Sequence, residues 1–248
     1  MKLKSLWPVL GLTLILASGP SLAEPYEDGY AAYGRGDYAT AFQIWNRLAD
    51  DGNQSGQYGL GELYSLGRGV PQDNRQAARW YERAAANGHV SAQSRLGALY
   101  DKGLGVPQNL SKAMKWYRRA AQQGDLAAQL SLGLIYGTGR GVPQNYFQAE
   151  KWFRLAAEQG DALAQYNLGL IYSGGHHVVP KDDVQALVWL SLAAKGGNEE
   201  AVKMRESLAK GMSPEKVAEA DKFAQDWMMA KAQDRAARCS MLGAGECK

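Results

Sequence analysis

Three short segments of the chain carry residue types that could do chemistry, and the first is a serine with a nearby lysine. Ser213-Pro-Glu-Lys216 has the Ser-x-x-Lys spacing in which penicillin-recognising enzymes place a nucleophilic serine beside a lysine. Serine followed by proline is equally typical of a helix N-terminus, with proline at the first helical position. The companion motifs of those enzymes are not evident in the sequence, so we interpret Ser213 as a helix cap.

The second segment is the adjacent pair His176 and His177, since neighbouring imidazoles can bind a metal ion. A zinc site needs three or four protein ligands, and His89 is the only other histidine. We therefore predict solvated loop residues and no metal site. The sequence also shows no phosphate-binding loop, catalytic triad or paired acid site, so we predict no catalytic residue, no cofactor and no enzymatic activity.

The third segment is the tail 233–248, which holds the only two cysteines, Cys239 and Cys247. In an oxidising compartment two cysteines this close in sequence favour a disulfide, and two glycines between them let the short loop close. Closure of such a loop contributes about 2.5 kcal/mol in the chain-entropy model. We predict a disulfide that fixes only the end of the chain; an exchange-active thiol pair is the alternative.

The N-terminal segment predicts export. Lys2 and Lys4 precede an apolar run over residues 9–16, and Ser21-Leu22-Ala23 places small residues where signal peptidase reads. This pattern is typical of a secretory signal peptide, and the run is too short for a transmembrane helix. We expect residues 1–23 to be cleaved after Ala23 and the mature chain to be periplasmic or secreted; an uncleaved anchor is the alternative.

Charge and hydropathy after that segment limit the partners. Loss of its two lysines would lower the formal net charge from +3 to +1. The basic residues form no run, so nothing predicts nucleic-acid binding. No later segment is apolar enough to span a bilayer, so we predict no integral membrane segment after signal cleavage.

Further along the chain, a Leu-Gly pair recurs every 36 residues, and each copy is followed about twenty residues later by a tryptophan. A fixed period between 20 and 50 residues is typical of solenoids, whose units pack only against their neighbours. Within each period, two apolar stripes at helical spacing are separated by glycines and a proline, which predicts two helices joined by a turn. The recurring residues are Gly61, Gly97, Gly133, Gly169, Trp80, Trp116, Trp152 and Trp189.

The other repeated positions have structural interpretations. Glycine inside a helix costs about 1 kcal/mol relative to alanine, so the Leu-Gly glycines predict close approach of a neighbouring helix. The tryptophans are predicted to lie in the core between successive units, and a ligand-stacking ladder is the alternative. Helix caps are expected at Asp73, Asn109, Asn145 and Asp182. Amides that satisfy buried carbonyls, rather than bind a ligand, are expected at Gln57, Gln93, Gln129 and Gln165.

We therefore predict an all-α fold: a right-handed α/α solenoid of about five helix-turn-helix units with a C-terminal capping helix pair. The solenoid is expected to occupy residues 24–232, and its first unit is shortened. The expected units are 26–53, 54–89, 90–125, 126–161 and 162–198, followed by the cap at 199–232.

The repeat resembles the Sel1-like repeat family, relatives of tetratricopeptide repeats. The matching pattern is Ala-x-x-x-Leu-Gly-x-x-Tyr, a Gly-x-Gly-Val turn, and then Ala-x-x-Trp and Ala-Ala-x-x-Gly; the stretch from Gly103-Leu-Gly105-Val106 to Ala121 fits almost without exception. The resemblance implies an adaptor or scaffold, and several exported bacterial members regulate signalling or help to build envelope structures. Some exported members are described as penicillin-binding or weak β-lactamase proteins, but those carry a cysteine pair in each repeat that this chain lacks.

The face of the first helices opposite their core stripe is the candidate binding surface. Its residues differ between units, whereas the core positions repeat. Aromatic, apolar and carboxylate groups together suit an extended peptide or a partner helix; the alternative is that the leucines pack within the superhelix. By helical register this face carries Tyr58, Glu62, Ser94, Ala98, Asp101, Leu130, Leu134, Tyr166 and Leu170.

These observations predict an exported protein–protein interaction module, an adaptor, scaffold or regulator that binds a protein partner segment along an inner groove. The alternatives are a structural component of an envelope or polysaccharide assembly, and a hydrolase acting on β-lactam or cell-wall peptide.

Overall fold

The computed structural model describes residues 24–176 and 178–242. Within them the chain forms α-helices and one isolated β-bridge, between His176 and Val179. The helices are α1 (Glu24–Gly34), α2 (Tyr38–Asp50), α3 (Gln54–Leu66), α4 (Asn74–Ala86), α5 (Val90–Lys102), α6 (Leu110–Gln122), α7 (Leu126–Thr138), α8 (Tyr146–Glu158), α9 (Ala162–Gly174), α10 (Asp183–Lys195), α11 (Glu199–Lys210) and α12 (Pro214–Leu242).

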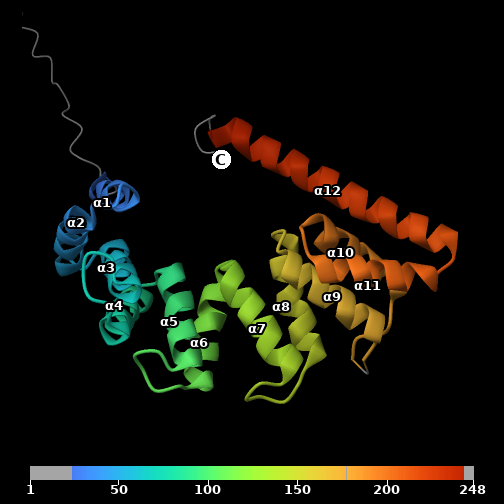
Figure 1. The fold of residues 1–248 in the computed structure, drawn as a ribbon, viewed down its shortest axis with the longest axis horizontal. Coiled ribbons are helices and arrows are strands. Elements are labelled where there is room, and N and C mark those ends of the chain that lie inside the picture. The colour runs from blue at the N-terminus through green and yellow to red at the C-terminus, as the bar shows by residue number, and fades with distance from the viewer. Residues whose placement is uncertain (1–23, 177, 243–248) are drawn as a thin grey trace, which may run out of the picture.

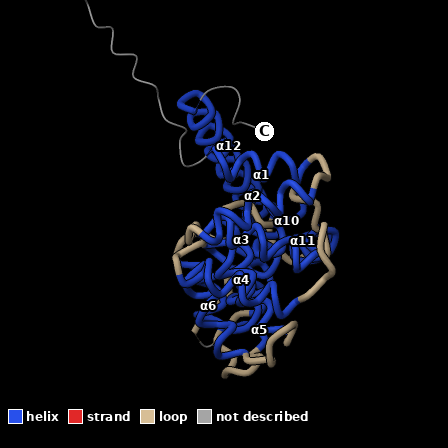
Figure 2. The backbone as a smooth tube through the Cα atoms, turned by 90° about the vertical axis from the view of Figure 1, so that its left-hand side faces the viewer, coloured by secondary structure: helices blue, strands red, loops and turns tan. Residues whose placement is uncertain are grey.

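The helices α1 to α10 form five hairpins that follow one another along an arc (Figure 1). Each second helix packs on the first helix of its own hairpin and on the first helix of the next one. This arrangement confirms the predicted all-α repeat solenoid of about five helical pairs. Figure 2, turned by 90°, views the arc from its N-terminal end, so that the successive hairpins lie behind one another and α12 is seen above them.

The second helices of the four full units begin at the predicted cap residues. Asp73, Asn109, Asn145 and Asp182 each accept a hydrogen bond at 2.9–3.1 Å from the backbone N–H of the third residue of their helix. At the start of α12, the Lys216 N–H points to Ser213 Oγ at 3.5 Å, with Pro214 as the first helical residue. Ser213 therefore occupies the capping position that we assigned to it.

The second glycine of each inter-helix turn is required by close packing. Gly69, Gly105 and Gly141 have φ values of 71°, 71° and 68°, and a Cβ on each would overlap the first residue of the second helix in the preceding unit. In the last full unit this glycine is missing, and the His176 ring stacks on Tyr146, the first residue of α8, with ring centroids 3.4 Å apart. His176 is half-buried, which corrects the prediction of a solvated residue; His177 lies outside the described residues.

The Leu-Gly glycines lie beneath side chains of the second helix in the same unit. A Cβ at Gly97 would lie 2.8 Å from the Tyr117 ring, and the equivalent neighbours of Gly61, Gly133 and Gly169 are Tyr81, Phe153 and Leu190. The tryptophans differ along the arc. Trp152 and Trp189 are buried, whereas Trp80 and Trp116 are half-buried and carry the guanidinium groups of Arg83 and Arg119 over their rings at 4.7 and 4.8 Å.

The recurring glutamines connect successive units through buried hydrogen bonds. The side-chain amides of Gln93, Gln129 and Gln165 donate to the carbonyl oxygens of Ala85, Ala121 and Ala157 at 3.1–3.2 Å. Two of these glutamines also accept an amide from the end of the following second helix, Gln93 from Gln123 at 2.9 Å and Gln129 from Gln159 at 2.8 Å. Satisfaction of buried carbonyls is thus the structural role of these three glutamines, as predicted, whereas Gln57 accepts a hydrogen bond from Asn87 Nδ2 at 3.3 Å.

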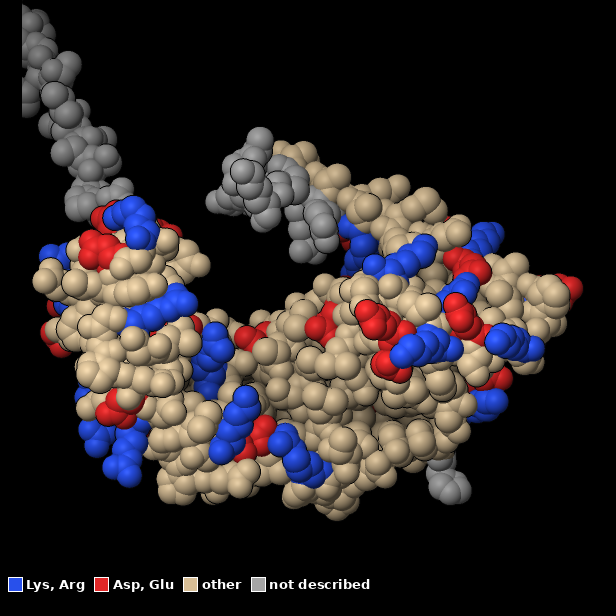
Figure 3. All heavy atoms as spheres, in the orientation of Figure 1, with Lys and Arg blue, Asp and Glu red and all other residues tan. Residues whose placement is uncertain are grey.

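The C-terminal end departs from the repeat. Helix α11 stacks on α10 as the first helix of a further unit would, but α12 turns back and packs on α10 instead (Figure 1). Arg205 of α11 joins these elements, since its guanidinium group donates to Ser191 Oγ at 2.8 Å and to Asp221 Oδ1 at 2.7 Å. Trp227 of α12 meets Trp189 edge-on. In the space-filling view of Figure 3, α12 overhangs the hollow side of the arc.

The C-terminal helical cap is longer than predicted from the sequence. We expected the cap to end at residue 232, but α12 continues to Leu242, because the added residues include no proline or glycine and are rich in helix formers such as alanine and arginine. Cys239 lies in this helix. The predicted disulfide partner Cys247 and the predicted signal peptide 1–23 both lie outside the described residues.

Candidate functional site

Next to the side chains that pack on the Leu-Gly glycines lies a surface of the first helices α3, α5, α7 and α9. We call this surface the track. It is formed by the residues one and four positions after each Leu-Gly glycine, together with the turn that follows each helix; the residues two positions after each glycine are buried in the core. Helices α5 and α7 contact each other directly, so the parts of the track on these two helices adjoin.

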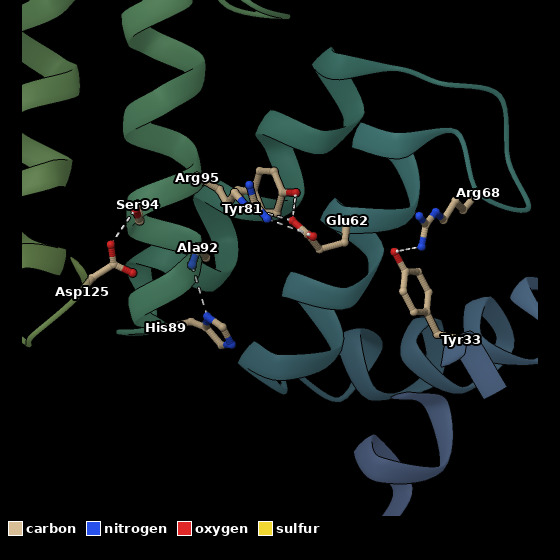
Figure 4. Close-up of polar contacts among 9 residues, drawn as sticks. All are labelled: Tyr33, Glu62, Arg68, Tyr81, His89, Ala92, Ser94, Arg95 and Asp125. Atoms are coloured by element: carbon tan, nitrogen blue, oxygen red, sulfur yellow. Dashed lines mark hydrogen bonds and ion pairs between the residues drawn. The ribbon is translucent and has the colours of Figure 1, made fainter. Parts of the chain in front are cut away.

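A polar cluster centred on Glu62 occupies the track at α3 (Figure 4). The Tyr81 hydroxyl donates to Glu62, and Arg95 of the next unit approaches the same carboxylate, with Nε 3.1 Å from Oε1. Burial, and then the Glu62 charge, raise the pKa of Tyr81 well above its usual value. This phenol therefore stays protonated and acts as a fixed donor to the carboxylate.

The next unit contains a second cluster of the same design. Asp101 is buried and receives Nη2 of Arg140 at 2.9 Å, while the Tyr117 hydroxyl lies 3.5 Å from the same carboxylate oxygen. Burial and the Asp101 charge raise the pKa of Tyr117 to about 12. Each cluster thus joins a tyrosine of its own unit to an arginine that reaches back from the next unit.

In the last two full units, both the tyrosine hydroxyl that donates and the carboxylate that accepts are absent from these positions. Phe153 and Leu190 stand where Tyr81 and Tyr117 carry a hydroxyl, and the Glu62 position is taken by Leu134 and Leu170. A buried hydroxyl without a partner costs about 1–3 kcal/mol, so the paired change avoids that cost. The track therefore changes from polar at α3 and α5 to apolar at α7 and α9.

The apolar part of the track contains an open cavity of about 320 Å³ between α7, α8 and α9. Leu134, Phe153 and Leu170 form much of its wall, and the stacked Tyr146 and His176 lie at one side. The remaining lining residues are Gly137, Thr138, Asn167, Ile171 and Gly174, so none of the lining side chains is a Lys, Arg, Asp or Glu. The cavity suits an uncharged apolar side chain.

Comparison with protein families identifies the repeat, because the model of the Sel1 repeat matches residues 54–89, 90–125, 126–161 and 162–198. The chain belongs to the Sel1 repeat family. A Sel1 repeat protein from Oxalobacter formigenes is 32% identical, with a TM-score of 0.68 over 81% of this chain and 84% of that chain. A protective antigen of uropathogenic Escherichia coli, c5321, which displays an SLR fold, is 33% identical with a TM-score of 0.74, over 89% of this chain and 48% of that one.

A Sel1 repeat protein from Klebsiella pneumoniae, 21% identical with a TM-score of 0.50, shares the fold. No curated protein sequence matches the chain. Sel1 repeat proteins are generally protein-interaction modules, which points to protein partners. Among residues 24–176 and 178–242, no group of three His, Cys, Asp or Glu is arranged to hold a metal ion, and no described helix is long and apolar enough to cross a membrane.

The Sel1 repeats bring only some of the predicted site residues together. Leu134 and Leu170 share the cavity, and Glu62 and Asp101 lie in the two polar clusters. Ala98 shares the register of Glu62 and is partly buried against a core cluster. The remaining four residues lie a turn nearer the start of their helices, at the junctions between units. Tyr58 stacks on His89, Ser94 is buried and donates to Asp125 (Figure 4), and Leu130 and Tyr166 are partly buried against the C-terminal core clusters.

Several residues of the Sel1 repeat track were missed from the sequence. Arg95 and Arg140 belong to the following unit, and Tyr146 and His176 come from a second helix and a turn, so the register of the first helices does not include them. The signal that could have found the cavity is the change from tyrosine at 81 and 117 to Phe153, since it coincides with loss of the carboxylates.

The junction between the second and third units contains a neutral histidine cap. His89 Nδ1 accepts a hydrogen bond from the Ala92 N–H at 3.2 Å, where the other first helices of the full units have Asn or Asp caps. Burial lowers the pKa of His89 below its usual value. A protonated Nδ1 would become a donor and could no longer accept this bond, and its charge would be unfavourable at a helix N-terminus.

This cap predicts a pH-dependent stability. Because the folded pKa is lowered, the stabilisation is complete above the unfolded pKa of about 6.5 and is lost as the pH falls from there through the folded pKa. We expect the melting temperature to fall between about pH 7 and pH 5, by the equivalent of about 1 kcal/mol for one cap. His89→Asn should flatten this part of the profile relative to the native protein; an unchanged slope would assign the pH dependence to other groups.

Proposed function

We propose that this protein is an exported interaction module that binds a partner polypeptide along the track, with an apolar side chain of the partner in the cavity beside Leu134. The observation that carries the proposal is that cavity, which opens on the same surface as the two polar clusters. Fixed polar groups orient a bound segment, and apolar burial supplies most of the affinity. The polar part of the track at α3 and α5 would orient the partner, and the apolar part at α7 and α9 would supply the affinity.

Family membership and sequence support different parts of this proposal. Protein interaction agrees with the general role of Sel1 repeat proteins. Export to the periplasm or to the outside of the cell rests on the apolar N-terminal segment with Lys2 and Lys4. An adaptor or regulator of an envelope process is the role that combines the two, and a structural part of an envelope assembly is the second candidate.

The cavity can be filled without harm to the fold, which gives a sharp test. Gly137 lies in α7 and lines the cavity, and a Cβ there would meet Ala149 and Phe153 only at ordinary contact distances of 3.5 and 3.7 Å. Gly137→Leu should raise the free energy of unfolding by about 0.5–1 kcal/mol, because leucine favours a helix more than glycine does. The same change should abolish partner binding, because the added side chain occupies the anchor position.

Partner capture can be measured by photocrosslinking in intact cells. A photoreactive residue replaces Asn167 at the cavity wall, and a matched protein has it at Phe147, an exposed residue of α8 that does not line the cavity. We expect a dominant crosslinked protein from position 167 that is lost in Gly137→Leu. Equal crosslinking from positions 167 and 147, or crosslinking that survives Gly137→Leu in a folded protein, contradicts the proposal and leaves the structural role ahead.

A further inference from the structure

We infer that the partner segment is acidic close to its apolar anchor and that Arg95 and Arg140 bind its carboxylates. The inference rests on the proposed function and adds the chemistry of the partner. The charges of the two polar clusters are layered by depth. The side chain of Arg95 is 58% exposed over a Glu62 that is 17% exposed, and Arg140 is 53% exposed over an Asp101 that is 10% exposed. A ligand that approaches the track therefore meets guanidinium groups first.

These guanidinium groups are held in place but not saturated. Arginine has five N–H donors. The Glu62 carboxylate accepts from Nε of Arg95 at 3.1 Å and from Nη2 at 3.4 Å. The Asp101 carboxylate accepts from Nη2 of Arg140 at 2.9 Å. The planar guanidinium group favours carboxylates, which can accept two parallel hydrogen bonds. Because Glu62 and Asp101 already order the two arginine side chains, binding a second carboxylate costs less conformational entropy than ordering a free arginine would.

A third arginine extends the same arrangement toward the N-terminus. Arg68 stands at the position of Arg140 two repeats earlier, between the two glycines of its turn. It donates to the Tyr33 hydroxyl at 2.6 Å (Figure 4) and lies over the Tyr33 and Tyr38 rings at 5.0 and 5.6 Å. Like the other two, it reaches back to the preceding unit. Figure 3 shows basic side chains along the N-terminal arm, with acidic side chains beside several of them.

The cavity fixes where the acidic residues of the partner must lie. Arg140 follows the cavity residue Thr138 by two positions, and the helix that carries Asp101 contacts the helix that carries Leu134. An extended chain advances about 3.3 Å per residue. We therefore expect a carboxylate within a few residues of the anchor to reach Arg140, and further acidic residues to extend toward Arg95. The partner is a segment with Asp or Glu beside an apolar residue.

The test is selection from a display library of random peptides on the purified protein, followed by fluorescence anisotropy of the enriched peptides. We expect enrichment of Asp and Glu near an apolar residue, and a Kd that rises with salt. Arg140→Gln is combined with Asp101→Asn, so that no buried carboxylate is left unpaired. This pair should raise the Kd about tenfold, the usual effect of losing one charge-assisted hydrogen bond. Arg79→Gln, which removes an exposed arginine of α4 outside the two clusters, should leave it unchanged.

The outcomes separate this inference from the proposed function. The selected peptides could lose binding to Gly137→Leu and yet carry no excess of acidic residues and bind the Arg140→Gln, Asp101→Asn protein with unchanged Kd. That result overturns the inference and leaves the proposed function in place. If every selected peptide binds Gly137→Leu as well as it binds the native protein, both the inference and the proposed function are overturned. Displacement of acidic peptides by a single-stranded oligonucleotide at equal concentration would show a general anion surface, and it also overturns the inference.

Discussion

Replacement of Phe153 by alanine should lower the free energy of unfolding by about 3–5 kcal/mol, the usual cost of deleting a buried phenylalanine ring. The ring is only 2% exposed, covers Gly133 and forms part of the cavity wall. Units of a solenoid contact only their neighbours, so the loss should act first on α7 to α10. Urea unfolding measures the total, and hydrogen exchange should show faster opening in these helices than in α1 to α4.

The chain offers a matched control for this prediction. Phe147 lies on the same helix and is 56% exposed, so Phe147→Ala should change the stability by no more than about 0.5 kcal/mol. The comparison holds the residue type and the helix constant and varies only the burial. Equal losses from the two substitutions, or uniform acceleration of exchange along the arc, would contradict the proposed packing of Phe153.

Substitution of Gly105 by alanine should cost about 2–5 kcal/mol. The φ value of 71° lies in the left-handed region, which costs a non-glycine residue about 1–2 kcal/mol. The added Cβ would also overlap the backbone of Asn74 at the start of α4, and overpacking of this kind typically costs about 1–3 kcal/mol. Thermal unfolding at a fixed protein concentration measures the sum.

Other glycines separate the two contributions. Gly124 has a φ value of 92°, but a Cβ added there would have no neighbouring atom within 4 Å, so Gly124→Ala should cost only the conformational part, about 1–2 kcal/mol. Gly34 has open space and no positive φ, so Gly34→Ala should be neutral or slightly stabilising. If the losses at Gly105 and Gly124 are equal, close approach of the loop to α4 is not a source of stability.

The fold could be predicted from the sequence because the same local signals recur in each unit. The caps at Asp73 and Asn109, the turn glycines and the apolar stripes each specify structure within a few residues, and four copies of them agree. The end of α12 was predicted too early, because the expected apolar face stops near Trp227, whereas the residues up to Leu242 favour a helix by composition and the first glycine after residue 232 is Gly243.

The candidate site was only partly predictable, because it is built across units. Helical register identified Leu134 and Leu170, which share one cavity. Register could not show that Arg140 reaches back to Asp101, or that His176 takes the space of a missing glycine over Tyr146. Those contacts depend on how one unit rests on another, which no pattern within a single unit specifies.

Arg205 has a consequence for the association of whole molecules. Counted from the helix caps, Arg205 and Glu206 stand in α11 where each full unit has its Leu-Gly pair. The site that would receive the next second helix therefore carries two charged residues, and α12 turns away to α10. An open solenoid end could accept the first hairpin of another molecule and add copies head to tail without limit. A further second helix would have to cover both charged residues, so we expect Arg205 and Glu206 to disfavour such addition at this end of the stack.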